Sequence, residues 1–118
     1  MPIVHVRGTQ SRASLATRKA LGHVATKTAL AVDCAVHEVW CTFESLVATT
    51  IGERVPAEDE AILYVELLMR PRSAQVDVDA LEAAARGAAE SFHTKLENVW
   101  ARLVPIEPAN VFAGGAPL

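Results

Sequence analysis

The segment Glu38-Val39-Trp40-Cys41 returns sixty positions later as Asn98-Val99-Trp100-Ala101. Leu21 and Leu81 are separated by the same sixty positions. A repeat of this period within a chain of 118 residues predicts two copies of one supersecondary unit inside a single domain. The patterns on either side of the repeated segment show what that unit is.

Each copy lies in a stretch that predicts a strand, a helix and a second strand. Residues 3–7 and 38–44 are the expected strands of the first half, with many β-branched and aromatic side chains. Residues 61–69 and 98–106 are those of the second half, and the apolar run 61–69 is expected to be buried on both faces. Apolar residues recur at helical spacing within each half, at Ala20, Leu21, Val24, Ala25 and Thr28, and then at Val78, Leu81, Ala85, Ala88, Phe92 and Leu96.

This order predicts an α+β fold made of duplicated β-α-β units. Crossover connections between parallel strands are right-handed, so both helices should lie on one face of a four-stranded sheet. We expect a single domain over residues 1–118, with halves at about 1–55 and 56–118. The other face of the sheet would then be bare. Because hydrophobic residues make up 51% of the chain, association with further subunits is the simplest cover for that face.

Composition argues against several classes of partner. The net charge is −3 and the Lys and Arg residues are scattered, so neither nucleic acid nor a membrane is expected to bind. The pattern shows no signal peptide and no apolar run long enough to span a bilayer. Cys34 and Cys41 lie seven positions apart and are expected to be reduced thiols in a cytoplasmic protein. The four histidines are dispersed, so we expect no metal site and no cofactor.

Three segments of the chain carry a resemblance to known proteins. The first is Met1-Pro2-Ile3-Val4, where a strand opens directly after a proline at position 2. The second, Leu68-Met69-Arg70-Pro71-Arg72-Ser73, is similar to the segment after the third strand in malonate semialdehyde decarboxylases. The third, residues 108–115, is similar to the Gly-ending segment that closes the active site of 4-oxalocrotonate tautomerase. Together with the repeat, these segments make nearly the whole chain resemble the tautomerase superfamily, and the resemblance implies a tautomerase-like homotrimer.

The resemblance assigns catalysis to Pro2, because removal of Met1 would leave its nitrogen as a secondary amine. An α-amino group titrates at about pH 7.7–8.0, and apolar surroundings and nearby cations lower its pKa further. A neutral amine can move a proton between two atoms of a small 2-oxo or enol carboxylic acid. Arg70 and Arg72 match the two carboxylate-binding arginines of the decarboxylases, and are expected to hold the carboxylate of the substrate.

Four further residues are candidates for the same site. Glu38 falls near the acidic residue that the decarboxylases use beside the proline, and Arg12 lies where single-unit tautomerases have a carboxylate-binding arginine. Phe112 and Trp100 are expected to supply apolar walls. A second arginine of the single-unit tautomerases aligns here with Trp40 or Trp100, which argues against efficient use of dicarboxylates.

Three functions stay open on the sequence. The leading hypothesis is a tautomerase with Pro2 as general base. The second is decarboxylation of a 3-oxo acid, with protonated Pro2 as the acid and Glu38 assisting. The third is a binding or structural protein without catalysis, in which Pro2 is an ordinary strand residue and Arg70 and Arg72 are solvated charges where Pro71 ends a strand.

Overall fold

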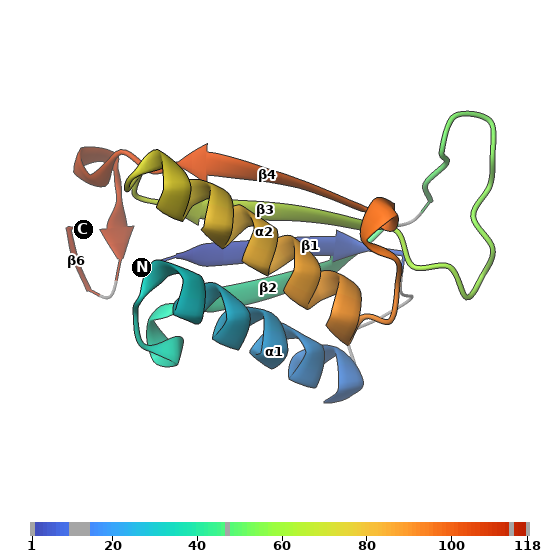
Figure 1. Cartoon of the computed structure of the whole chain (residues 1–118), viewed down its shortest axis with the longest axis horizontal. Coiled ribbons are helices and arrows are strands. Elements are labelled where there is room, and N and C mark those ends of the chain that lie inside the picture. Colours follow the sequence, from blue (N-terminus) through green and yellow to red (C-terminus); the bar gives the residue numbers. More distant parts are fainter. Residues whose placement is uncertain (1, 10–14, 47, 114, 118) are drawn as a thin grey trace.

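The computed structural model of the chain describes residues 2–9, 15–46, 48–113 and 115–117. It has the expected α+β architecture, in which two helices cover one face of a four-stranded sheet (Figure 1). The strands are β1 (Ile3–Gly8), β2 (Trp40–Ser45), β3 (Leu63–Met69) and β4 (Val99–Pro105), in the spatial order β2-β1-β3-β4. β2 runs parallel to β1 and β4 runs parallel to β3, while the central pair β1 and β3 is antiparallel.

Helices α1 (Leu15–Val32) and α2 (Ala74–Ser91) run antiparallel across the sheet (Figure 1). They come close together at Gly87, where an added Cβ would lie 3.4 Å from the Cβ of Lys27 and from the Cα of Val24. The apolar stripe predicted for α2 is partly wrong, because Val78 is exposed and Leu96 lies beyond the end of the helix. Two helices can approach this closely because small residues form the buried face of α2, namely Ala80, Ala84, Gly87, Ala88 and Ala89.

The sixty-residue repeat extends to backbone geometry at the helix ends. Asp33 and His93, which follow α1 and α2, have left-handed φ angles of 55° and 56°. The next residue closes each helix with the same bond, from the Cys34 amide to the Ala29 carbonyl at 3.1 Å and from the Thr94 amide to the Ala89 carbonyl at 2.9 Å. The 3-10 turns η1 (Val36–Glu38) and η2 (Leu96–Asn98) then lead into β2 and β4. The β2 and β4 strands consequently begin later than expected.

The sheet separates a buried face from a partly exposed one. Alternate residues of β1 and β3 point into the core beneath the helices, and the largest of them are Val4, Val6, Leu63, Val65, Leu67 and Met69. The intervening residues Tyr64, Glu66 and Leu68 are only half-buried. The expectation that this strand is buried on both faces is therefore wrong for the single chain, since the helices cover only one side of the sheet.

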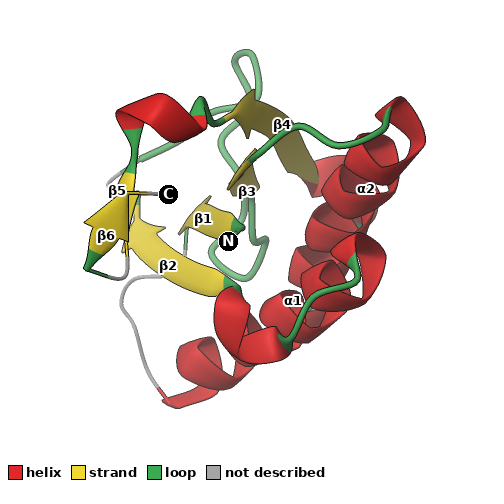
Figure 2. Cartoon of the chain, turned by 90° about the vertical axis from the view of Figure 1, so that its left-hand side faces the viewer, coloured by secondary structure: helices red, strands yellow, loops and turns green. Residues whose placement is uncertain are grey.

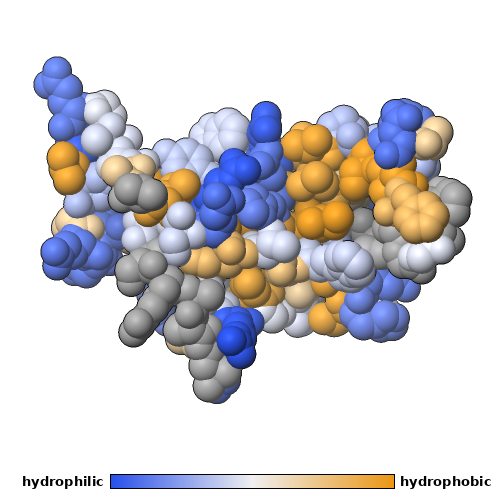
Figure 3. Space-filling model, turned by 180° about the vertical axis from the view of Figure 1, so that it is seen from behind, coloured by the Kyte–Doolittle hydropathy of each residue, from blue (hydrophilic) through white to orange (hydrophobic). Residues whose placement is uncertain are grey.

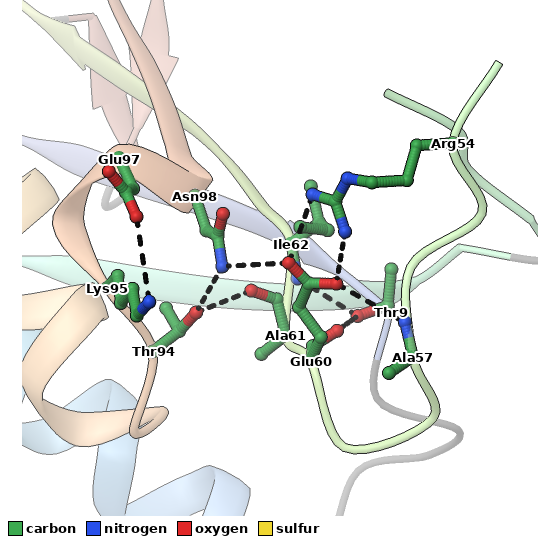
Figure 4. A network of polar contacts seen from close by, with 10 residues as sticks. All are labelled: Thr9, Arg54, Ala57, Glu60, Ala61, Ile62, Thr94, Lys95, Glu97 and Asn98. Carbon is green, nitrogen blue, oxygen red and sulfur yellow. Dashed lines mark hydrogen bonds and ion pairs between the residues drawn. The ribbon is translucent and has the colours of Figure 1, made fainter. Parts of the chain in front are cut away.

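Glu60 holds the long connection between β2 and β3 in place through hydrogen bonds (Figure 4). Its carboxylate accepts hydrogen bonds from the two terminal nitrogens of Arg54 at 2.8 and 3.1 Å, and from the Ala57 amide at 3.2 Å. The Asn98 side chain lies 3.5 Å away on the other side, and the Glu60 carbonyl accepts from the Thr9 hydroxyl at 3.3 Å. The hydrogen bonds from Arg54, which are the largest cause, hold the pKa of Glu60 below its ordinary value.

No helix in the described part of the chain is both long and apolar enough to cross a membrane.

Two helical glycines allow a test of the contact between α1 and α2. Replacing Gly87 with Leu should lower the free energy of unfolding by about 1–3 kcal/mol, because the larger side chain must push α1 away. Gly22, on the exposed side of α1, has no atom within 4 Å of the position a Cβ would take. Gly22→Ala should therefore raise stability by about 0.5–1 kcal/mol through helix propensity alone. Urea unfolding measures the free energy of unfolding of both variants. Similar changes in that free energy for the two substitutions would contradict the close contact between α1 and α2 at Gly87.

The Arg54–Glu60 pair predicts a pH dependence of stability. A depressed carboxyl pKa contributes stability that is complete above the ordinary glutamate pKa and is lost as the pH falls through the folded-state pKa. Arg54→Gln should therefore be less stable than the parent chain at neutral pH, with the difference shrinking toward about pH 3. Urea unfolding at both pH values gives the comparison. Arg86→Gln, which breaks a pair within α2, is the control for removal of a surface cation, and a difference independent of pH would disprove the prediction.

Candidate active site

Pro2 lies at the edge of the sheet where β1 and β2 begin and β3 and β4 end. Its carbonyl accepts a hydrogen bond from the Trp40 amide at 3.0 Å, and its ring is less than 2% exposed. Figure 2 looks onto this end, where the short strands β5 (Phe112–Ala113) and β6 (Ala116–Pro117) lie beside the amino terminus. The strands β5 and β6 thus lie at the same end of the sheet as Pro2.

A cavity of about 410 Å³ opens at Pro2, and its wall is formed by Pro2, Met69, Arg70 and Arg72. Both arginines reach it for a local reason. Pro71 ends the ladder of β3 after Met69, and Ser73 begins α2 by accepting from the Val76 amide at 3.2 Å. The segment 70–72 therefore turns from sheet to helix beside Pro2. A cavity of this size is suitable for a small ligand, and its charged wall favours an anion.

The two arginines differ in how they are held. The Nη1 atom of Arg72 donates to the Val32 carbonyl at the end of α1 at 2.8 Å, and the Arg72 amide donates to Asp77 Oδ1 at 3.0 Å. Arg70 is exposed and, among the described residues, makes no side-chain hydrogen bond or ion pair. Arg72 is therefore anchored before any ligand binds, whereas Arg70 extends toward solvent.

Glu38 lies near this end of the sheet, although it does not line the cavity. It is the last residue of η1 and is exposed. Burial raises the pKa of the Cys34 thiol, the Glu38 charge raises it further, and the Arg72 charge lowers it. The Cys34 thiol is therefore near enough to sense the charges of both Glu38 and Arg72.

Of the remaining candidates, Phe112 and Trp100 lie at opposite ends of the sheet. Phe112 is 71% exposed and begins β5 at the Pro2 end (Figures 1 and 2). Trp100 lies at the opposite end of the sheet on the uncovered face, with its ring centroid 6.4 Å from that of Tyr64. A single chain therefore does not bring Trp100 to Pro2. Arg12 lies outside the described residues.

A charged network crosses the uncovered face of the sheet, and sequence reasoning missed it. Glu66 accepts from Arg102 Nε at 2.8 Å and lies 3.5 Å from Arg7 Nη1. Glu44 lies 3.5 Å from Arg7 Nε and 3.4 Å from His5 Nε2, so the network spans all four strands. The hydrogen bonds from Arg102 are the main cause of a lowered pKa at Glu66. The sequence feature that could have indicated this network is Glu66, a glutamate at the centre of the otherwise apolar strand β3.

The network divides this face into two parts (Figure 3). Ile3, Leu68 and Val104 face one another across three strands on the Pro2 side. Tyr64 and Trp100 lie on the other side, next to a cavity of about 460 Å³ that Arg7 and Arg102 also line. An apolar area thus adjoins the Pro2 end, and an aromatic area occupies the far end.

Cys34 and Cys41 are both free thiols. Burial raises the pKa of Cys41 to about 11. Among the described residues, no group of three or more His, Cys, Asp or Glu side chains is placed to hold a metal ion.

No protein-family model matches the sequence, and no curated protein sequence matches it. Solved structures match its fold over almost the whole chain. The structure of Pt0534 inactivated by 2-oxo-3-pentynoate gives a TM-score of 0.82 at 14% identity, covering 98% of this chain and 94% of that chain. A symmetric trimer of fused 4-OT gives 0.81 at 14% identity, covering 97% and 93%. Malonate semialdehyde decarboxylase gives 0.72 at 14% identity, covering 95% and 90%.

At these identities the comparisons establish the fold, which is the tautomerase fold that the repeat and the three sequence segments predict.

Proposed function

We propose that this chain is a member of the tautomerase superfamily that interconverts the enol and keto forms of small 2-oxo carboxylic acids without a cofactor. The observation that carries the proposal is the cavity of about 410 Å³ in which Pro2 meets Arg70 and Arg72. A base and two carboxylate-binding cations on one small cavity are the groups that this reaction needs.

The proton transfer requires no oxidant and no metal. The Pro2 amine removes the proton of the enol 2-hydroxyl group, and the electron pair of the C2–C3 double bond takes up a proton at C3. The amine is returned to its starting state when it donates that proton. Arginine holds the substrate carboxylate through paired N–H bonds and stabilises the negative charge that develops on the 2-oxygen.

The mechanism needs a free amine on Pro2, so it depends on removal of Met1. A peptide-bonded proline nitrogen has no basicity. In the processed chain, an amine beside two arginines at a buried ring should titrate below the range of about 7.7–8.0 that is usual for an α-amino group. It would then be neutral, and active as a base, at physiological pH.

The proposal includes assembly as a homotrimer in the cytoplasm. The fused 4-OT structure with the same fold is a symmetric trimer. The uncovered face, with its half-buried Leu68 and exposed Trp100, offers a surface for neighbouring copies. Trp100 would then contribute to the site of another subunit, because its own chain holds it far from Pro2. The free thiols of Cys34 and Cys41 suit a reducing compartment.

A second candidate reaction is decarboxylation of a 3-oxo acid. Glu38 favours it, because this carboxylate precedes β2 at the Pro2 end of the sheet and its charge acts on the same Cys34 thiol as that of Arg72. A nearby negative charge would keep the Pro2 amine protonated, as an acid rather than a base. Malonate semialdehyde decarboxylase shares the fold.

Pro2→Ala tests the tautomerase. With phenylenolpyruvate as substrate, the parent chain should catalyse ketonisation, and kcat/KM should fall by about 10²–10⁴-fold in the variant. The assay records loss of the enol absorbance. Pro56→Ala, in the distant β2–β3 connection, is the matched control and should keep full activity. Intact mass must show loss of Met1 in the assayed sample, and a processed Pro2→Ala protein with unchanged ketonisation would rule out the mechanism.

Glu38→Gln separates the two reactions. If decarboxylation is the activity, malonate semialdehyde should release carbon dioxide, and the variant should lose that release by at least about tenfold. Ketonisation of phenylenolpyruvate should change little, because the tautomerase needs the neutral amine. No carbon dioxide from a sample free of Met1 would exclude the second candidate.

A further inference from the structure

We propose that Asp77 is a positioning residue for the Pro2 cavity, holding Arg72 so that its guanidinium spans from the end of α1 to the cavity wall. This inference rests on the proposed function, because it gives Arg72 the task of receiving the substrate carboxylate. Asp77 itself lies in the first turn of α2 and does not line the cavity.

Asp77 holds the backbone of Arg72 in place through a hydrogen bond. Its Oδ1 atom accepts from the Arg72 amide at 3.0 Å. Its own amide donates to the Ser73 carbonyl at 3.0 Å, which is the first bond of the helix, and Ser73 Oγ accepts from Val76. The carboxylate therefore folds back over the helix start onto the residue just before the cap, where negative charge is favourable. The direction of residue 72 is thus set by α2 and not by a free loop.

The other end of Arg72 is held by α1. Its Nη1 atom donates to the carbonyl of Val32, which is the last residue of α1 and is 1% exposed. Carbonyls at a helix end lack partners within the helix, and a cation there also interacts favourably with the helix dipole. A guanidinium has five donor hydrogens, and this bond uses one of them. The rest of the planar group stays available for a carboxylate, with little rotamer freedom left to lose on binding.

Arg70 provides the contrast. It lines the same cavity without any side-chain hydrogen bond or ion pair among the described residues. Arg72 is therefore pre-organised by two helices, and Arg70 must become ordered when a ligand binds. Removing Asp77 should weaken carboxylate binding by freeing Arg72, and should affect KM more than kcat.

Three variants isolate this role. Asp77→Ala removes the acceptor, and Asp77→Asn keeps an amide oxygen in its place. Asp79→Ala removes a neighbouring carboxylate that, among the residues the structure describes, accepts only from Gln75, at 2.8 Å, so it is the matched control for charge. With phenylenolpyruvate, Asp77→Ala should raise KM on the order of tenfold, while Asp77→Asn should recover most of the loss and Asp79→Ala should stay close to the parent.

Cys34 gives a second readout that does not depend on catalysis. Its alkylation rate by iodoacetamide against pH reports the thiol pKa, measured in a Cys41→Ala background. The Arg72 charge lowers this pKa, so a released Arg72 should let it rise. Loss of the Asp77 charge alone would lower it, so the two effects have opposite signs. The Cys34 pKa measured in Arg72→Gln gives the rise expected when the Arg72 charge is removed completely.

The possible outcomes test the positioning role of Asp77 separately from the proposed tautomerase activity. A Cys34 pKa in Asp77→Ala that is unchanged or lower, or a KM that matches Asp79→Ala, would overturn the positioning role. If the parent chain fails to ketonise phenylenolpyruvate, the proposed function fails, and the Cys34 titration still decides whether Asp77 holds Arg72. Circular dichroism establishes that each variant is folded. If Asp77→Ala does not fold, Asp77→Ser supplies the shorter side chain for the same comparison.

Discussion

The antiparallel pairing of β1 with β3 places Ile3 opposite Leu68, so the beginning of the chain meets the end of a strand from the other half. Each half has only a parallel pair, whose strands begin at the same edge of the sheet. The antiparallel junction turns one half around against the other. The start of β1 and the end of β3 therefore share an edge, and Pro2 comes to lie beside the segment that leads into α2. Without that junction, a proline at one terminus and arginines in mid-chain would not form one cavity.

The parts that the sequence predicts well are those in which one residue pattern has one physical outcome. Period-two and period-3.6 patterns place the four strands and both helices, and the repeat at Trp40 and Trp100 shows that the two halves are equivalent. The motif at 68–73 associates Arg70 and Arg72 with Pro2 through resemblance, which carries information about spatial neighbours that local pattern lacks, and the three residues line one cavity.

Other features depend on tertiary register, which no local pattern reveals. The close contact at Gly87 explains why the expected stripe on α2 is only partly right, because small side chains are needed where two helix backbones come close together. The anchoring of Arg72 by Val32 joins residues forty positions apart across the layer. The charged network around Glu66 likewise needs four strands in alignment before its members meet. Trp100 shows the limit of residue-by-residue transfer, since its chain carries it to the far end of the sheet.

The two halves are alike in backbone but unlike in chemistry, because a chain has only one amino terminus. β1 begins at that terminus, whereas β3 begins after an internal peptide bond, where Ile62 donates its amide hydrogen to Thr9. The repeat therefore reproduces the scaffold of β1 at β3, but the position before β3 holds Ile62, whose nitrogen is a peptide amide. That second strand start is instead held by hydrogen bonds through Thr9 and Glu60 to the loop that precedes it. Two halves with the same backbone design thus contribute different groups to one cavity, because the first supplies Pro2 and the second supplies Arg70 and Arg72.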